Sequence, residues 1–242
     1  PDLRGNDVAL PYQRDLFKLL SSRSISIPPL KQYRPTRDLL HVSGLLLTGD
    51  TLDVFVCHLP SRSGGAKESE SYRLYAAHIL RMEVDSIMSI RSLPQVIIMG
   101  DFNDYPTNQS IQKILEAEAP PVTTNNLAST TGSTNFSTVA PSSLKLYHLL
   151  ARKAKSKDFG SYKYRGEWGL LDHLIVSGTL LNQSNHFFTS EEKANVCLLP
   201  FLLKDDEKYG DKEPFRTYKG MKYQGGVSDH LPIYADFELI LY

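Results

Sequence analysis

The sequence predicts a mixed α/β sandwich, in which strands are connected both as hairpins and through helices. Residues 39–47 and 52–58 are apolar segments separated by a short polar turn, which is typical of a hairpin. In residues 67–92 the apolar side chains recur near helical spacing, and a compact apolar strand follows at 95–99. Hairpins combined with a strand–helix–strand unit favour a mixed sheet over an all-parallel one.

Length and composition indicate one ordinary globular domain over residues 1–242. Hydrophobic residues make up 41% and charged residues 22% of the 242 positions. Lys+Arg and Asp+Glu are equal at 27 each, so net charge does not point to a nucleic-acid or membrane partner. No apolar run approaches the roughly 18 residues that span a bilayer. Cys57 and Cys197 lie in apolar segments and fit buried thiols better than a disulfide, which leaves both a cytoplasmic and an exported location open.

Four further segments complete the first half of the chain. Residues 7–11 are expected to form a short strand, and the glycines and serines of 60–65 indicate a loop. A helix is expected over 107–118, with a Thr or Asn as its N-cap. Residues 119–143 are rich in Pro, Thr, Ser and Asn, which is typical of a long loop.

The second half is expected to continue with a short helix at 144–151, a strand at 170–176 and a final strand at 231–239. Between the first two lies a basic stretch, 152–165, interleaved with aromatic residues. Arg165 and the nearby Trp168 are therefore candidates for binding the backbone and bases of a nucleic acid, although such a run also fits a solvated face.

Asp101 and Asn103 follow directly after the strand at 95–99, within Gly-Asp-Phe-Asn. Two residues apart at a strand end, their side chains can point into the same cleft. The carboxylate of Asp101 can orient water or bind a hard cation, and the Asn103 amide can donate to a phosphoryl oxygen. The alternative is a simple turn, since Gly, Asp and Asn all favour turns.

Asp229 and His230 form a second candidate pair, within Ser-Asp-His-Leu-Pro. His230 has the pKa range of a general base, and Asp229 offers an oxygen ligand for a metal. Asp172 lies in a largely apolar strand, where an unpaired carboxylate would cost several kcal/mol. It therefore needs a partner, which is either a catalytic histidine or a structural hydrogen bond. Its neighbour His173 faces the other way and is expected to be structural.

His58 ends the strand at 52–58 and begins a polar loop that contains Arg62. A histidine and an arginine in this position can contact a phosphate. A surface histidine before a turn fits the local sequence equally well.

Taken together, these motifs resemble the endonuclease/exonuclease/phosphatase superfamily, which has the fold of deoxyribonuclease I. The resemblance covers almost the whole chain, and its most specific part is the pairing of Gly-Asp-Phe-Asn with Ser-Asp-His. Two segments, 162–168 and 215–225, are similar to members common in Bacteroidetes-type bacteria. The segments that carry the resemblance are 4–10, 58–65, 100–104, 168–177 and 228–232.

The resemblance implies a four-layer sandwich, with two mixed sheets packed face to face and helices outside. It also implies a phosphoric ester hydrolase that uses Mg²⁺ or Mn²⁺, in which His230 paired with Asp172 activates water and Asp101 helps to position that water. Asn103 and His58 would hold the phosphoryl oxygens, and Asp229 would lie at or near the metal. A phosphodiesterase or endonuclease is the leading expectation. A phosphomonoesterase, a lipid-head-group phosphatase and a non-catalytic binding or scaffold protein are the alternatives.

One expected part of the family pattern has no counterpart in the chain. Relatives carry an Asn and a metal-binding Glu on strands that precede the segment matching Arg4–Gly5. We therefore expect a truncated domain in preference to a true loss of the metal ligand. Such a fragment is expected to have weak or no activity and to self-associate through exposed sheet.

Overall fold

The computed structural model describes residues 7–30, 33, 35–62, 64–122 and 141–241. Its centre is a mixed six-stranded sheet in which only the β3–β4 pair is parallel, so the predicted α/β class is confirmed. The paired segments at 39–47 and 52–58 form the predicted hairpin. In spatial order the strands are β1 (Phe17–Ile25), β2 (Leu39–Leu46), β3 (Thr51–His58), β4 (Gln95–Asp101), β8 (Asp172–Ser177) and β5 (Leu146–His148).

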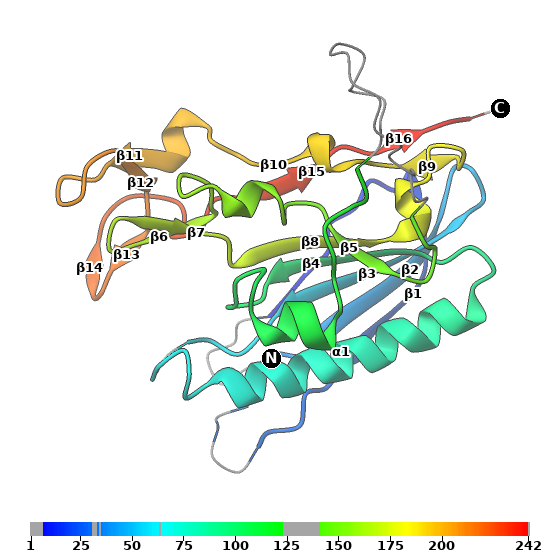
Figure 1. Ribbon diagram of the computed structural model, residues 1–242, viewed down its shortest axis with the longest axis horizontal. Coiled ribbons are helices and arrows are strands. Elements are labelled where there is room, and N and C mark those ends of the chain that lie inside the picture. Colours follow the sequence, from blue (N-terminus) through cyan, green and yellow to red (C-terminus); the bar gives the residue numbers. More distant parts are fainter. Residues whose placement is uncertain (1–6, 31–32, 34, 63, 123–140, 242) are drawn as a thin grey trace, which may run out of the picture.

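One face of this sheet is covered by α1 (Glu70–Ile90), which connects β3 to β4 (Figure 1). Its buried residues recur every three or four positions, so they form one stripe that packs on the sheet. The helix stops at Arg91, shortly before Pro94, which cannot continue a helix. Within the described part of the chain α1 is the single α-helix, and it is not apolar enough to cross a membrane.

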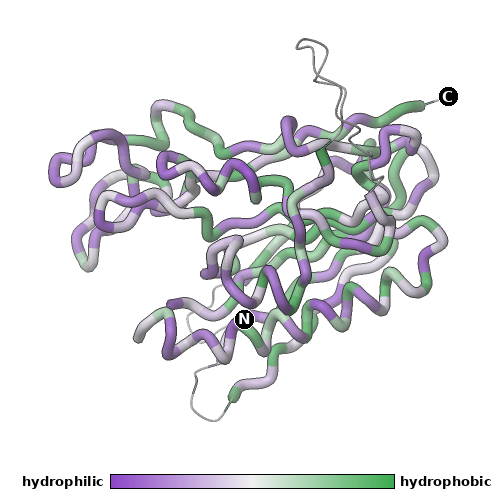
Figure 2. The backbone as a smooth tube through the Cα atoms, viewed as in Figure 1, coloured by the Kyte–Doolittle hydropathy of each residue, from purple (hydrophilic) through white to green (hydrophobic). Residues whose placement is uncertain are grey.

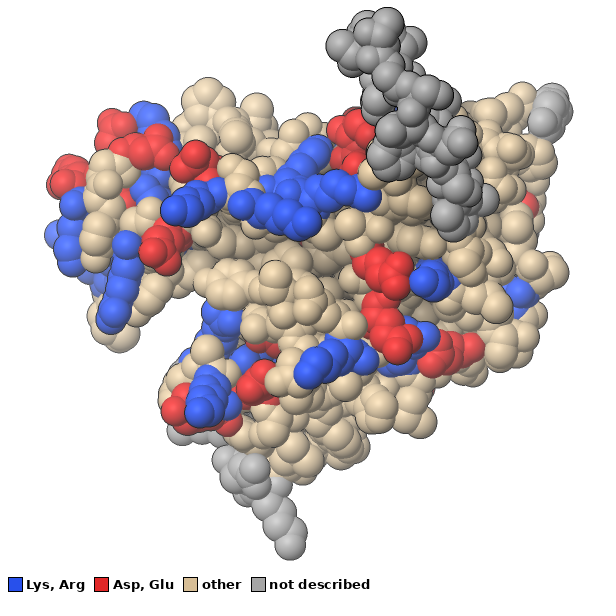
Figure 3. Space-filling model, in the orientation of Figure 1, with Lys and Arg blue, Asp and Glu red and all other residues tan. Residues whose placement is uncertain are grey.

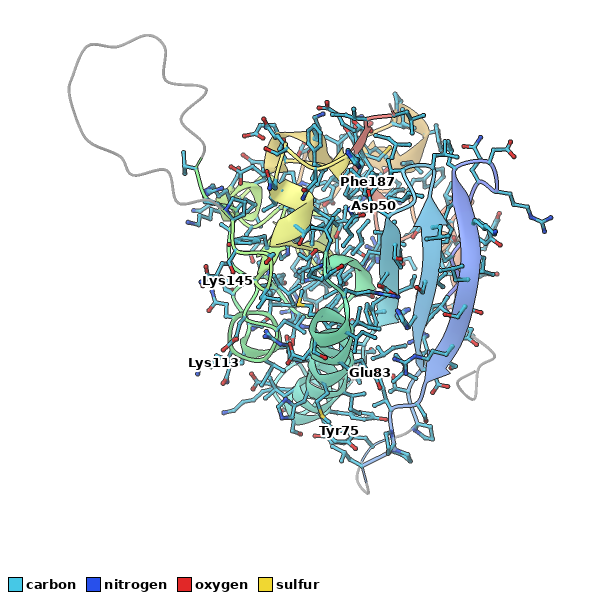
Figure 4. All side chains as sticks on the ribbon, turned by 90° about the vertical axis from the view of Figure 1, so that its right-hand side faces the viewer. Asp50, Tyr75, Glu83, Lys113, Lys145 and Phe187 are labelled. Atoms are coloured by element: carbon cyan, nitrogen blue, oxygen red, sulfur yellow. The ribbon has the colours of Figure 1, made fainter. Side chains whose placement is uncertain are left out.

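The opposite face is covered by short antiparallel pairs instead of a continuous second sheet. A second buried core fills the space between these pairs and the central sheet. In Figure 2 segments of hydrophobic residues, coloured green, lie on both sides of that space. Asp50, in the β2–β3 turn, lies beside Phe187 in Figure 4 and forms an ion pair with His186 (3.6 Å). The pairs are β10 (Ala194–Val196) with β15 (Ile233–Ala235), and β9 (Phe187–Phe188) with β16 (Glu238–Leu239).

Three small hairpins extend beyond the β4–β8 end of the central sheet, at the left of Figure 1. They are β6 (Tyr162–Tyr164) with β7 (Glu167–Gly169), β11 (Leu203–Asp205) with β12 (Lys212–Pro214), and β13 (Tyr218–Lys219) with β14 (Lys222–Tyr223). The remaining elements are single turns: a π-turn at Ser110–Ile114 and 3₁₀ turns at Lys153–Lys155, Gly178–Leu181, Glu191–Lys193 and Pro200–Leu202.

The structure corrects the predicted elements near the chain's beginning. Residues 7–11 do not form a strand. The first strand of the structure is β1, which was not predicted from the sequence. Seven of the nine residues of β1 are exposed because it is an edge strand, so it shows no apolar alternation. The helix expected at 107–118 is only the short π-turn at Ser110–Ile114.

Two later elements also differ from the predictions. The helix expected at 144–151 is the strand β5, because pairing with β8 outweighs the local helical spacing. The final strand expected at 231–239 is split into β15 and β16 by Asp236, whose N–H and C=O bond to Lys193 and Thr189 and not to a neighbouring strand. Most of the loop expected at 119–143 lies outside the described residues, as does the segment 4–6.

Gly100 has a backbone conformation and a close contact that require glycine. Its φ is +130°, and a Cβ at this position would lie 1.9 Å from the carbonyl oxygen of Cys57 on β3. We expect Gly100→Ala to lower the free energy of unfolding by about 3 kcal/mol, from backbone strain and steric overlap together. Urea titration measures this change. Gly49→Ala is the matched control, because its φ of +83° has no neighbouring atom within 4 Å, and about 1 kcal/mol is expected there. Equal losses at the two sites would contradict the steric argument.

Candidate active site

Three adjacent strands of the central sheet place polar side chains at one edge. In the β3–β4 register His58 lies beside Asp101, and in the β4–β8 register Asp101 lies beside Asp172. The His58 Nε2 atom is 3.4 Å from Asp101 Oδ2. His58 and Asp101 are 43 positions apart in the sequence, and Asp101 and Asp172 are 71 positions apart. Strand register alone brings them together.

His230 reaches this edge from the segment that follows the β13–β14 hairpin. The backbone N–H of Leu231 donates to the Ser161 carbonyl (2.7 Å), and the His230 ring packs against Tyr162 with ring centroids 4.9 Å apart. His230 Nδ1 then donates to Asp172 Oδ2 (2.7 Å), which also accepts from Ser161 Oγ (2.5 Å). The partner that Asp172 requires is thus the candidate catalytic histidine.

The electrostatics of the cluster raise the pKa of both an acid and a base. Burial alone would lower the pKa of His230. The hydrogen bond that His230 donates to Asp172 and the negative charges of Asp172, Asp101 and Asp229 outweigh this effect of burial and raise the pKa to about 9. Burial, together with the charge of Asp172, raises the pKa of Asp101 to about 6. The cluster therefore holds closely spaced carboxylates that a cation would stabilise in their charged form.

Asn103 orients Asp101. Its backbone has a left-handed conformation, with φ at 51°, which Asn adopts more readily than most residues. Its backbone N–H donates to Asp101 Oδ1 (2.8 Å), and its side-chain Nδ2 donates to Asp101 Oδ2 (3.2 Å) and to the Leu59 carbonyl (3.1 Å). Both hydrogens of the amide thus point at the protein.

One group of potential ligand atoms is spaced closely enough for a metal ion. Atoms of Asp101, Asp172 and His230 lie within 4.8 Å of one another, and all three side chains are partly accessible. Two carboxylates suit a hard divalent cation such as Mg²⁺ or Mn²⁺. Asp229, the metal ligand predicted from the sequence, is exposed and lies outside this group of three.

The predicted substrate-binding residues lie around the cluster, not within it. The Arg62 guanidinium lies 4.4 Å from the centre of the Tyr105 ring and 3.7 Å from Asp104. The Arg165 guanidinium lies 5.2 Å from the Tyr164 ring, on the β6–β7 hairpin. Trp168 is half-buried against the second core.

Two residues of the site were not predicted from the sequence. Arg37 is 5% exposed, and its positive charge opposes the rise in the pKa of Asp101. It precedes β2 and so emerges at the same sheet edge as His58, which is the signal that could have identified it. Ser161 hydrogen-bonds Asp172 but lies in a segment with no recognisable motif.

The chain is similar to one known protein family over almost its whole length. The model of the family described as "Endonuclease/Exonuclease/phosphatase family" matches residues 1–239. No curated protein sequence matches the chain.

Several solved structures share the fold. The human Nocturnin catalytic domain has a TM-score of 0.50 at 18% identity, covering 94% of this chain and 62% of that one. Truncated TDP2 from Caenorhabditis elegans has a TM-score of 0.51 at 14% identity, covering 90% and 65%. A mannosyl-6-phosphatase from Bacteroides thetaiotaomicron has a TM-score of 0.52 at 16% identity, covering 93% and 68%. The chain thus spans less than two thirds of the Nocturnin and TDP2 chains.

Proposed function

The chain belongs to the endonuclease/exonuclease/phosphatase family, and on this premise we propose that it hydrolyses phosphate esters, preferentially phosphodiesters, with a divalent metal ion. The observation that carries the proposal is the 2.7 Å hydrogen bond between Asp172 and His230, made beside the carboxylate of Asp101. An acid that holds a histidine next to a second acid is the arrangement needed to activate a water molecule.

In the proposed mechanism His230 is the general base. Its Nδ1 atom is occupied by Asp172, so Nε2 is the nitrogen that accepts a proton from the attacking water. Asp172 holds the ring in this orientation and stabilises the imidazolium that forms. Asp101 positions the water, and Asn103 fixes Asp101 through contacts with both of its carboxylate oxygens.

The donors around Asp101 fit a divalent cation. Asp101 and Asp172 offer carboxylate oxygens within the cluster, and Asp229 is the further acid that we assign to the metal. When bound, Mg²⁺ or Mn²⁺ supplies Lewis-acid stabilisation of the phosphoryl charge, and its positive charge lowers the pKa of nearby groups. His58, 34% exposed at the cluster's edge, is assigned to the phosphoryl oxygens, and Arg62 to the outer part of the substrate.

A phosphomonoesterase is the second candidate. It is favoured by the likeness of the fold to the B. thetaiotaomicron mannosyl-6-phosphatase. The two activities share the same site residues. They differ in whether the phosphoryl group that remains after the leaving group departs still carries a second ester.

The proposal is tested by hydrolysis of bis(4-nitrophenyl) phosphate and 4-nitrophenyl phosphate in Mg²⁺ or Mn²⁺. We expect faster turnover of the diester, loss of activity with a chelator, and a rate roughly 10²–10⁴-fold lower for His230→Ala, since general-base catalysis contributes this much. His78→Ala, at an exposed position on α1, is the matched control. Equal rates for His230→Ala and His78→Ala would refute the site, and faster turnover of the monoester would favour the second candidate.

A further inference from the structure

Two hairpins flank the catalytic edge, the edge of the central sheet at which His58, Asp101 and Asp172 lie. The proposed mechanism does not use these hairpins. They are β6–β7 and β13–β14, at the left of Figure 1 beyond the ends of β4 and β8. Figure 3 shows the surface notched below these hairpins, and the lobe to which they belong carries Lys and Arg side chains interspersed with Asp and Glu. The chain passes from the end of β14 to Asp229 and His230 within seven residues, so the second hairpin is connected directly to the site.

A row of aromatic rings leads outward from His230 along β6. The Tyr162 ring lies 4.9 Å from the His230 ring, centroid to centroid. Tyr164 is stacked on Tyr162 at 6.4 Å with an angle of 12° between the rings, and it is 56% exposed. The Arg165 guanidinium lies over Tyr164. The row therefore starts at the candidate base and ends in solvent with an aromatic face and a positive charge.

The β13–β14 hairpin presents the same two chemistries on opposite faces. Tyr218 pairs with Tyr223 across the strands, and Lys219 pairs with Lys222. Because successive side chains in a strand alternate faces, the tyrosines share one face and the lysines the other. The tyrosines are 58% and 64% exposed, so they are not part of a core.

The charge on this hairpin is of one sign. Residues 215–227 contain one Arg and two Lys and no Asp or Glu. Lys219 and Lys222 make no ion pair with any described residue, although like charges directly opposite each other destabilise a strand pair. In the adjacent β11–β12 hairpin, by contrast, the lysine on each strand pairs with an acid: Lys204 with Glu213 (3.3 Å) and Lys212 with Asp205 (2.6 Å).

The base of the hairpin is held rigidly, so these side chains have a defined position. The N–H of Val227 donates to the Phe215 carbonyl (2.8 Å), and Thr217 Oγ1 donates to the Val227 carbonyl (2.7 Å). Gly226 packs so closely on Phe215 that a Cβ would lie 2.0 Å from its carbonyl oxygen.

From these observations we propose that the β6–β7 and β13–β14 hairpins form a binding surface for single-stranded nucleic acid and direct it to the catalytic edge. The proposal rests on the proposed function, because it names the substrate class of the same site. Exposed tyrosine faces bind unstacked bases, and unpaired lysines bind a polyphosphate backbone. An anionic membrane is less well matched, because the single fully exposed apolar residue of the hairpin is Met221 (99% exposed).

The test is fluorescence anisotropy of a labelled 20-nucleotide oligothymidylate with the 242-residue chain in EDTA, so that no cleavage occurs. We expect salt-dependent binding that weakens roughly tenfold for each of Tyr218→Ala and Tyr223→Ala. Lys219→Ser and Lys222→Ser should each reduce the salt slope by about one. The control is Lys18→Ser, at the far end of β1 from His58. All variants should hydrolyse bis(4-nitrophenyl) phosphate like the wild-type chain, and circular dichroism verifies that they fold.

Unchanged oligonucleotide binding in the four hairpin variants would overturn the inference, as would hairpin-dependent binding to phosphatidylglycerol vesicles without binding to the oligonucleotide. The proposed function fails separately, if the wild-type chain does not hydrolyse bis(4-nitrophenyl) phosphate. The binding assay contains no metal and measures no hydrolysis, so the two failures are distinguishable.

Discussion

Asp172→Asn is expected to lower the rate of phosphodiester hydrolysis by roughly 10²–10⁴-fold. The asparagine keeps the size of the side chain but removes the negative charge that fixes and stabilises the His230 imidazolium. Steady-state kinetics with bis(4-nitrophenyl) phosphate should show the loss in kcat more than in KM, because Asp172 acts through His230 and not on the substrate.

The same substitution has a signature that does not depend on activity. In the metal-free wild-type chain the His230 ring should titrate with a pKa of about 9. In Asp172→Asn the main interactions that raise this pKa are lost and burial, which lowers it, remains. The His230 signal in a histidine NMR titration should therefore move to a lower pKa.

The raised pKa of His230 in the wild-type chain also predicts a dependence of stability on pH. The folded-state pKa of His230 lies above its unfolded value of about 6.5. The stabilisation is therefore fully present below pH 6.5 and is lost as the pH rises through about 9, and it amounts to about 3 kcal/mol. Asp172→Asn should show a smaller decline in stability over that range. Asp85→Asn, an exposed acid on α1, is the control, and a His230 pKa that stays near 9 in Asp172→Asn would contradict the assignment.

The site could be predicted where its signals are local. Asp101 and Asn103 follow an apolar strand within four residues, and His58 ends another, so strand-end chemistry is readable from the sequence. The need of Asp172 for a partner also follows from its apolar neighbours. That this partner is His230, 58 residues away, is fixed by the backbone bond from Leu231 to Ser161, which no local pattern encodes.

The features that the sequence did not predict have separate physical causes. Ser161 contributes one hydroxyl from an irregular segment. Arg37 contributes a charge from the position just before β2, and it can be placed at the site only if the register of β2 with β3 is known. The edge strand β1 was missed because exposure removes the alternation that identifies strands. The Asn103 amide donates to the Leu59 carbonyl and to Asp101, which the sequence did not indicate, and its contact with a phosphoryl oxygen stays a prediction.

A buried ion pair directly behind the site carries the second large prediction. Asp104, the residue after Asn103, is 2% exposed, and its Oδ1 accepts from Arg73 Nε at 2.7 Å. Arg73 itself is 1% exposed, and its other nitrogens donate to Ser69 Oγ and to the Ala66 carbonyl, both at 2.6 Å. The pair therefore anchors the beginning of α1 to the segment at the end of β4 that contains Asp101 and Asn103.

Asp104→Ala is expected to lower the free energy of unfolding by about 3–5 kcal/mol, because it leaves the Arg73 guanidinium buried without a counter-charge. Urea denaturation measures the loss. Asp85→Ala breaks the exposed Arg81–Asp85 pair on the same helix and should cost no more than about 0.5 kcal/mol.

The double variant Arg73→Met/Asp104→Leu separates the two causes of this loss. If the penalty comes from an uncompensated buried charge, removing both charges should restore most of the stability lost in Asp104→Ala. The rate of hydrolysis should recover less than the free energy of unfolding, because the segment that contains Asp101 and Asn103 would still lack its anchor to Arg73. A double variant as unstable as Asp104→Ala would show that packing of the loop, and not charge pairing, dominates at this position.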